Sequence, residues 1–317
     1  MSPLSTRPFF GLHIPNFTFP GVPDAGLFGK VIELAQAAEA AGFEQVTVMD
    51  HFNQIRGVGP EDEPMLEAYS ALAGIAMSTS RVRLGTLVTG VTYRNPALLA
   101  KTVTTLDIIS GGRAMLGIGA AWNESEHVGF GYDFPPIGQR MDRLGEALTI
   151  CKQMFTEDRP SFEGRHYRIE RAINRPRPIQ PGGPPILIGG MGERRTLRLA
   201  AEFADVTHWF ASSTADLEHK TEVLEQHCEA LGRDPSTIVK TMGSPVIPVA
   251  DEAEAEAVLA TIAPERRAAV TAATPERAAE LLSGYVAAGF TGFTFGNTML
   301  PTPESIAVAG EVIRLLG

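Results

Sequence analysis

The chain has 317 residues, of which 44% are hydrophobic and 20% are charged. This composition is typical of a globular protein and excludes a disordered chain, because ample apolar surface is available for burial. The formal net charge is −10, and no block of Lys or Arg interrupts the acidity, so a nucleic-acid-binding surface is not expected. No run of about 20 apolar residues predicts a membrane span.

Two cysteines, Cys151 and Cys228, lie far apart and form no CxxC pair, which predicts buried free thiols in a reducing compartment. The seven histidines are scattered without a metal-binding motif, so no metal site is expected. The segment Met1–Pro8 has no apolar core of signal-peptide length. The expected location is therefore the cytoplasm.

Apolar runs of strand length recur along the chain, and most are continuous rather than alternating. Such runs are typical of strands buried on both faces of a parallel sheet. Eight strands are predicted, at Phe9–Ile14, Gln45–Met49, Val82–Thr89, Ala114–Ile118, Pro185–Ile188, Asp205–Trp209, Thr241–Pro248 and Thr291–Phe295.

Amphipathic helices are predicted between these strands. The apolar residues of Phe28–Ala41 and of Pro275–Ala288 recur at helical spacing. Thr274 is a suitable N-cap before Pro275. Glycines at positions 42 and 289 are suitable for the ends of these two helices.

The tetrapeptide Ala-Ala-Gly-Phe occurs at 40–43 and again at 287–290. Each copy ends a predicted helix and precedes a predicted strand. Eight strands alternating with helices over about 300 residues predict an α/β fold, a (β/α)8 TIM barrel. A doubly wound sheet is disfavoured, because His13-Ile14-Pro15 follows the first strand where such a fold has a Gly-rich loop.

We expect a single domain over residues 1–317, because no break in composition divides the chain. The Pro- and Arg-rich stretch at about 159–185 is interpreted as an insertion between the halves of the barrel. A short hairpin is predicted within it, at Ser161–Ile169.

In a (β/α)8 barrel, functional residues lie at the carboxyl ends of the strands. Asp50 and His51 follow the second predicted strand. A histidine suits proton transfer near neutral pH, and the neighbouring carboxylate can orient it. The structural alternative is an Asp–His pair that only caps the following loop.

Three further strand ends carry residues suited to a ligand. After the third strand, three threonines with Tyr93 and Arg94 supply hydrogen-bond donors, although threonine is common in any strand. After the fourth strand, Gly117 to Ala121 are small enough for backbone to approach a flat ligand, and Trp122 and Asn123 add an aromatic face and an amide. After the fifth, Gly189 to Gly192 precede a helix predicted at Thr196–Phe203. Backbone amides at such a helix start favour a phosphate, and Arg194 and Arg195 add positive charge. The alternative is a tight turn with solvated arginines.

These stretches together resemble the luciferase-like family of flavin and deazaflavin oxidoreductases, most closely its coenzyme F420-dependent branch. The resemblance runs from Phe10 to about Phe295. Its motifs are Ala40–Phe43, Asp50–Phe52, Leu84–Thr86, Asn95-Pro96, Gly117–Glu124, Phe134–Pro136, Arg140, Arg143-Leu144 and Gly189–Glu193.

The resemblance implies a TIM barrel of the bacterial luciferase-like type, with a deazaflavin across the strand ends. By this resemblance Asp50 is an acidic cofactor contact and His51 the proton donor. A non-prolyl cis peptide is implied at Thr86–Leu87, behind the central ring, and Thr89 touches the ring system. The remaining implied cofactor contacts are Ala120, Ala121 and Asn123 along the ring edge, and Gly190, Met191 and Gly192 at the phosphate.

The resemblance implies F420-dependent hydride transfer between the deazaflavin C5 and an unsaturated carbon (C=O, C=C or C=N) of a small molecule, by a homodimer. An FMN-dependent monooxygenase working with a flavin reductase is the first alternative, and a non-catalytic flavin-binding protein the second. The sugar-phosphate dehydrogenase branch places a glutamate soon after the fourth-strand glycines. Here Ala121-Trp122-Asn123 occupy that neighbourhood and Glu124 is slightly displaced, so glucose 6-phosphate is not the expected substrate. An apolar or carbonyl-type substrate fits Phe17, Phe19, Trp122 and Phe210 better.

Overall fold

Nine parallel strands form the central sheet of the computed structural model, which describes residues 7–210, 213–261, 267 and 270–317. They are β1 (Phe9–Ile14), β2 (Gln45–Val48), β3 (Arg83–Thr86), β4 (Thr89–Gly90), β5 (Leu116–Gly119), β8 (Ile186–Gly189), β9 (Val206–Trp209), β10 (Val239–Gly243) and β13 (Phe290–Gly296). Neighbours follow the order β3-β2-β1-β13-β10-β9-β8-β5-β4. Most of the segment considered for a signal peptide, residues 1–6, lies outside the described residues.

The sheet closes into a barrel where β3 meets the residues that precede β5. The Leu84 amide donates to the Arg113 carbonyl at 2.9 Å, and the Met115 amide donates to the Leu84 carbonyl at 2.8 Å. Only Leu87 and Val88 separate β3 from β4, so these two short strands occupy one position in the barrel. The predicted (β/α)8 architecture is therefore confirmed.

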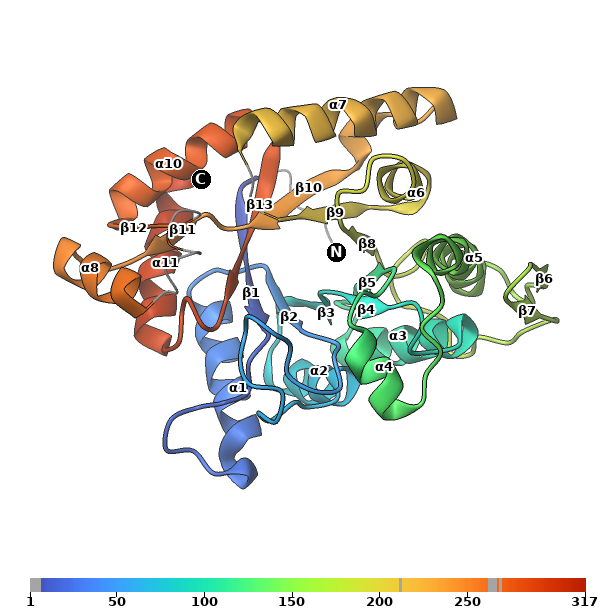
Figure 1. The fold of residues 1–317 in the computed structure, drawn as a ribbon, viewed down its shortest axis with the longest axis horizontal. Helices are drawn as coiled ribbons and strands as arrows, with labels where there is room; N and C mark the ends of the chain where they lie inside the picture. Colours follow the sequence, from blue (N-terminus) through green and yellow to red (C-terminus); the bar gives the residue numbers. More distant parts are fainter. Residues whose placement is uncertain (1–6, 211–212, 262–266, 268–269) are drawn as a thin grey trace.

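Helices surround the central strands (Figure 1). They are α1 (Asp24–Ala40), α2 (Ala68–Ser78), α3 (Pro96–Ser110), α4 (Glu124–Phe130), α5 (Ile137–Thr156), α6 (Thr196–Phe203), α7 (Thr214–Leu231), α8 (Glu252–Thr261), α10 (Pro275–Ala287) and α11 (Pro303–Leu316), with a short 3-10 turn at Pro235–Thr237. Gly42 and Gly289, which follow α1 and α10, have φ values of 91° and 90°. This left-handed conformation is the one expected of glycine just beyond a helix end.

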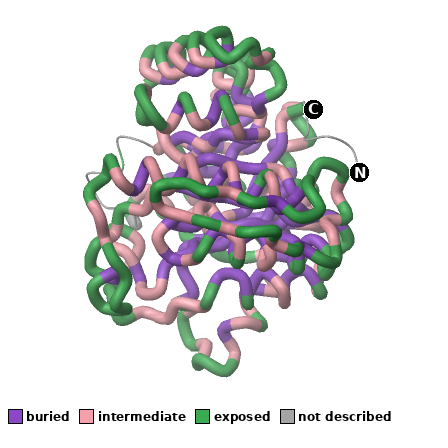
Figure 2. Tube along the Cα trace, turned by 90° about the vertical axis from the view of Figure 1, so that its right-hand side faces the viewer, coloured by how far each residue is buried: buried purple, intermediate pink, exposed green. Residues whose placement is uncertain are grey.

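The hydrophobic core lies between the outer faces of the strands and the helices. On β1, Phe10, Leu12 and Ile14 face this core and are fully buried. A separate buried cluster inside the barrel consists of Met115, Leu187 and Val206. Figure 2 shows burial concentrated in the central strands and exposure on the outer segments.

Two predicted strands are pairs of shorter strands in the structure. Val82–Thr89 divides into β3 and β4. Thr241–Pro248 divides into β10, which belongs to the barrel, and β11 (Val246–Pro248), which pairs instead with β12 (Thr271–Ala273). Pro245 lies between β10 and β11 and has no amide hydrogen to donate to a sheet, which explains the break.

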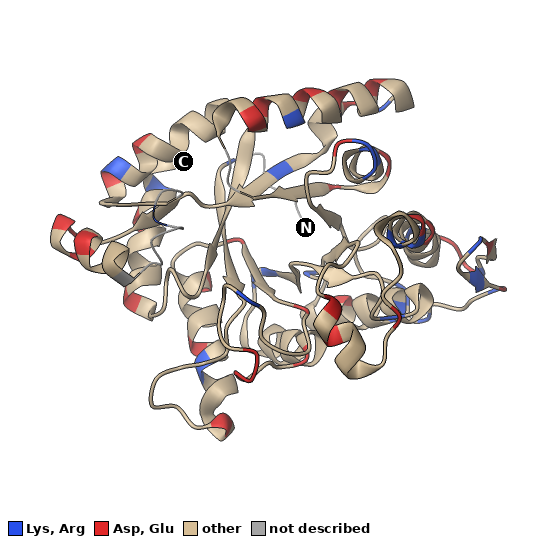
Figure 3. Ribbon diagram, in the orientation of Figure 1, with Lys and Arg blue, Asp and Glu red and all other residues tan. Residues whose placement is uncertain are grey.

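The predicted hairpin is confirmed, because β6 (Phe162–Glu163) and β7 (Arg168–Ile169) pair in antiparallel fashion. Thr274 is the N-cap of α10, as predicted, but its side chain accepts no capping hydrogen bond. Figure 3 shows acidic and basic residues along the outer helices, with acidic residues prominent on α7 and α8. Among the described residues, no helix combines the length and apolarity needed to cross a membrane.

Candidate active site

His51 and Glu126 form a hydrogen-bonded pair at the carboxyl end of β2. His51 lies three residues beyond β2, and Glu126 lies in the first turn of α4. The His51 Nδ1 atom lies 2.6 Å from Glu126 Oε1. The Glu126 side chain is fully buried, whereas the His51 side chain is 10% exposed. The pair is therefore shielded from water, while the imidazole keeps a small accessible surface.

Two further donors hold the Glu126 carboxylate. The Tyr93 hydroxyl donates to Oε1, and the Phe52 amide donates to Oε2 at 2.9 Å. Burial disfavours the charged form, but the hydrogen bonds from His51, Tyr93 and Phe52 outweigh it and hold the pKa of Glu126 below its ordinary value. An ionised carboxylate can only accept, so Nδ1 of His51 carries the shared proton. In the neutral imidazole, Nε2 is then the free basic nitrogen.

Aromatic side chains surround His51. The Trp122 ring lies edge-on to it, with 5.7 Å between ring centroids, and is 57% exposed. A contiguous aromatic group beside it contains Phe52, Tyr93, Phe130 and Tyr132. Phe17, in contrast, is fully buried in the core, so its predicted place in a substrate pocket is wrong.

Asp50 pairs with Arg94 rather than with its neighbour His51. The Arg94 guanidinium reaches both Asp50 oxygens, at 2.6 and 3.1 Å, and also Glu67 at 2.7 Å. Burial raises the pKa of Asp50, and the Arg94 charge opposes that effect. The expectation that Asp50 orients His51 is therefore wrong: adjacent residues on an extended segment point in different directions, and Glu126 holds His51 instead.

The segment between β3 and β4 forms the floor of the barrel mouth. The non-prolyl cis peptide lies at Leu87–Val88, one residue later than the expected Thr86–Leu87. Thr86 and Thr89 join their hydroxyls at 2.9 Å, and Tyr69 extends this chain to Thr89 at 2.8 Å. Both threonines are fully buried, so contact between Thr89 and a cofactor remains a prediction.

Glycines make room for this floor. A Cβ at Gly117 would lie 1.8 Å from the Thr86 carbonyl oxygen. A Cβ at Gly119 or Gly189 would lie 3.0 or 3.2 Å from the Val88 side chain. The small residues of β5 and β8 are therefore required by the backbone and by Val88, which fills the barrel interior beneath the mouth.

Small residues continue beyond β5 towards α4. Ala121 adopts φ 61°, a conformation unusual for a residue with a Cβ, and Ala120 and Ala121 are both half-buried. Arg140 donates to the Ala120 carbonyl at 3.1 Å and fixes this stretch. Asn123 is the N-cap residue of α4, and its side-chain oxygen accepts from Ser125. The arrangement leaves a flat edge at which a planar ring can approach the backbone.

The Gly190–Gly192 turn connects β8 to α6. The Gly190 amide donates to the His208 carbonyl at 3.0 Å, so this amide is committed within the protein and its predicted donation to a phosphate is wrong. The corresponding roles of Met191 and Gly192 remain predictions. Gly190 itself has φ 113°, which a residue with a side chain rarely adopts.

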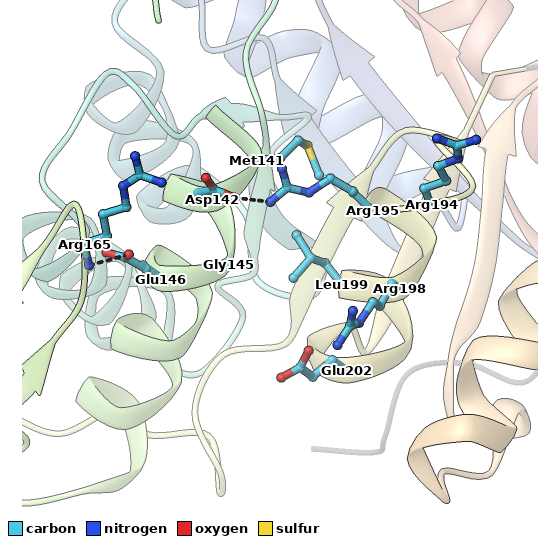
Figure 4. A pocket seen from close by; sticks show the side chains of 10 residues that line it. All are labelled: Met141, Asp142, Gly145, Glu146, Arg165, Arg194, Arg195, Arg198, Leu199 and Glu202. Carbon is cyan, nitrogen blue, oxygen red and sulfur yellow. Dashed lines mark hydrogen bonds and ion pairs between the residues drawn. The ribbon is translucent and has the colours of Figure 1, made fainter. Parts of the chain in front are cut away.

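Arg194 and Arg195 contribute to a pocket on the outer surface between α5 and α6 (Figure 4), with a volume of about 480 Å³. Arg195 pairs with Asp142 and donates to the Gly138 carbonyl at 2.8 Å. Arg165 and Arg198 add two further cations to the lining. Since Arg195 is directed to a carboxylate on α5, the structure does not bring it to the Gly190–Gly192 turn.

Glu126 is the site residue that the sequence analysis missed. Glu126 lies 75 positions from His51 along the chain, and nothing in the local sequence joins them. The available signal was the acidic start of α4, directly after the fourth-strand motif, where Glu124 and Glu126 offer two carboxylates. Glu124 is exposed, and Glu126 is the one that faces His51.

A family model described as "Luciferase-like monooxygenase" matches residues 9–312. The F420-dependent glucose-6-phosphate dehydrogenase of Kineococcus radiotolerans is 36% identical over 219 residues, which cover 68% of this chain and 62% of that protein. The enzyme of the same name from Nakamurella multipartita is 36% identical over 197 residues, 60% of this chain and 55% of that protein. The chain thus spans less than two thirds of the curated relatives that it matches.

Solved structures share the fold at low sequence identity. An F420-dependent secondary alcohol dehydrogenase, in complex with an F420-acetone adduct, has a TM-score of 0.80 at 21% identity and covers 98% of this chain and 99% of that one. The coenzyme F420-dependent tetrahydromethanopterin reductase of Methanopyrus kandleri has a TM-score of 0.80 at 20% identity, covering 98% and 100%. A long-chain alkane monooxygenase reaches 0.81 at 17% identity, covering 99% and 92%. The fold therefore does not distinguish reductases from monooxygenases.

Proposed function

This chain belongs to the luciferase-like monooxygenase family, and from that premise we propose that it is an F420-dependent oxidoreductase. The reaction is hydride transfer between the deazaflavin C5 and an unsaturated carbon of a small molecule. The curated relatives named as F420-dependent dehydrogenases support the choice of cofactor. The His51–Glu126 pair is the observation that carries the proposed chemistry, because it supplies a positioned base beside an aromatic wall.

The residues at the mouth fit a planar ring system. Glycines in β5 and β8 accommodate the Val88 floor, and Ala120 and Ala121 add no bulk at the edge above it. When bound, the deazaflavin supplies the carbon that accepts or donates the hydride. The remaining proposed cofactor contacts are Thr89, Asn123, Met191 and Gly192. Asp50 contributes to the cofactor site through its ion pair with Arg94.

His51 acts as the proton acceptor when the substrate is oxidised. For an alcohol, the carbon loses a hydride and the hydroxyl loses a proton, which His51 Nε2 takes. The ionised Glu126 then stabilises the imidazolium through Nδ1, and Tyr93 and Phe52 keep that carboxylate in place. In the reverse direction the imidazolium returns the proton to the carbonyl oxygen. Burial of Glu126 strengthens this charge interaction.

The test is F420 reduction by secondary alcohols with wild-type protein and the His51→Ala variant. Loss of a positioned general base lowers turnover by about 10²–10⁴-fold. The variant is expected to bind F420 with less than a threefold change in affinity, because His51 is not a proposed ring contact. Unchanged turnover in His51→Ala would refute the role of His51. On the family resemblance, we also propose that the protein is a homodimer and that it is located in the cytoplasm. Sedimentation of the purified protein tests the oligomeric state.

A further inference from the structure

Two histidines outside the His51–Glu126 pair face the inside of the barrel. His13 lies on β1 between two residues of the outer core, so its side chain points inwards. His208 lies on β9 two residues after Val206, a member of the interior cluster, and faces the same way. Both lie near the carboxyl ends of their strands, which is the end of the barrel that holds His51.

The His13 ring interacts electrostatically with His208 and with His51, and His13 and His208 are both partly exposed. Burial lowers the pKa of His13 to about 3, and repulsion from His208 and from His51 adds to that effect. Burial also lowers the pKa of His208, to about 4. Both side chains nevertheless keep partial exposure. Both rings are therefore uncharged at neutral pH, face the inside of the barrel and remain partly accessible.

Hydrogen bonding fixes which nitrogen of His208 carries the proton. The Thr241 hydroxyl donates to the Thr207 carbonyl at 2.9 Å, and a carbonyl can only accept. The His208 Nδ1 atom lies 2.9 Å from the same Thr241 oxygen. Since that hydroxyl has already used its hydrogen, Nδ1 of His208 must donate to it. The Nε2 atom of His208 is thus an acceptor.

His13 is held in a similar way from the neighbouring strand. Its Nδ1 atom lies 3.1 Å from the Thr47 hydroxyl oxygen, on β2. The two histidines are thus each anchored through Nδ1 by a threonine of an adjacent strand. This anchoring orients both rings and leaves the opposite nitrogen of each away from its threonine.

We propose that His13 and His208 form a second substrate-binding position, which receives a neutral hydroxyl- or amide-bearing end of the substrate. This inference rests on the proposed function for the group that reacts beside His51. His208 Nε2 accepts a hydrogen bond, so the recognised group is a donor. An ionised carboxylate has no hydrogen to give to His208 Nε2 and meets no cation in this pair, so carboxylate ends are selected against.

Three small probes of matched shape test the proposal: acetamide, a neutral donor; acetone, neutral without a donor; and acetate, an anion without a donor. Long-range ¹H–¹⁵N spectra of the histidine rings report tautomer and binding, and His208→Gln identifies the His208 signals. We expect His208 to be protonated at Nδ1. We expect its Nε2 signal to report an affinity for acetamide that is at least about tenfold higher than for acetone or acetate, the difference that one hydrogen bond makes. Acetate binding as tightly as acetamide, an Nε2-protonated His208, or no response to acetamide overturns the proposal.

Thr241→Val is the matched variant, because it removes the hydroxyl and nearly preserves the side-chain volume. We expect His208 to populate both tautomers in this variant and to lose its preference for acetamide. An unchanged single tautomer contradicts the role of Thr241 as a positioning residue. The spectra need no cofactor, so a protein that fails to bind F420 refutes the proposed function and leaves this result standing.

Discussion

At the scale of single residues, the candidate chemistry depends on one carboxylate that reaches His51 from a different element. Sequence adjacency pointed to Asp50, and the structure assigns that residue to Arg94. Residue types at the strand ends could be predicted because each strand end is a local pattern. The His51–Glu126 contact could not, since it depends on how α4 packs against the segment that follows β2.

We expect Glu126→Gln to lower turnover by roughly 10²-fold or more, because the neutral amide no longer stabilises a protonated His51. F420 affinity should stay close to that of the wild type, since Glu126 lies behind His51. Single-turnover reduction of F420 separates these two effects.

Tyr93→Phe is the matched control for Glu126→Gln. It removes one hydrogen-bond donor to Glu126 and leaves the His51 contact in place, so turnover should fall much less than in Glu126→Gln. Equal losses in the two variants would show that the charge of Glu126 is not what matters.

At the scale of elements, strands and helices with a strong local period were predicted well, and interruptions were not. The helix α6 has the predicted bounds, Thr196–Phe203, and β1 has the predicted bounds, Phe9–Ile14. Thr241–Pro248 reads as one apolar run, yet its second part leaves the barrel for a separate two-stranded sheet. Periodicity describes which residues are buried, but it does not say in which sheet they pair.

The close packing of β5 against the segment that joins β3 to β4 predicts that Gly117→Ala strongly lowers the stability of the fold. The added Cβ would lie 1.8 Å from the Thr86 carbonyl oxygen, so backbone must move. We expect a loss of about 2–3 kcal/mol or more in the free energy of unfolding, measured with urea.

Gly29→Ala is the control for Gly117→Ala. Gly29 lies within α1, and a Cβ there meets nothing within 4 Å. Alanine should stabilise that helix by about 0.5–1 kcal/mol. A Gly117→Ala protein as stable as the wild type would contradict the described packing of β5.

Glu39 connects α1 to the start of β3 and predicts an acid-sensitive contact. Its carboxylate accepts from the amides of Ser80, Arg81 and Val82 at 2.6 to 3.1 Å. Although burial opposes it, these bonds lower the pKa of Glu39 from 4.5 to about 2. A carboxyl whose folded pKa is depressed stabilises the fold above its unfolded pKa, and that stability is lost as pH falls through the folded pKa.

The free energy of unfolding should therefore fall between about pH 5 and pH 2 more steeply in the wild type than in Glu39→Gln. Urea unfolding at a series of pH values measures both slopes. Glu33→Gln is the control, because Glu33 pairs only across a surface turn of the same helix, with Lys30. Parallel curves for wild type and Glu39→Gln would count against this contact.

At the scale of the whole molecule, the first and last barrel strands lie beside each other in the sheet. β1 pairs with β13, and Phe10, Phe43, Phe293 and Phe295 form an aromatic cluster across this seam. The repeated Ala-Ala-Gly-Phe made the similar ends of the chain visible in the sequence. Since both ends contribute to one core, we propose that the chain is one barrel domain.

The same barrel supports reductases and monooxygenases among the structural neighbours, so the cofactor decides between the two chemistries. Fluorescence titration of the purified apoprotein with F420 and, separately, with FMN is the most direct test. We expect micromolar affinity for F420 and much weaker binding of FMN. Preferential binding of FMN would contradict it and would assign the His51–Glu126 pair to a flavin-dependent reaction.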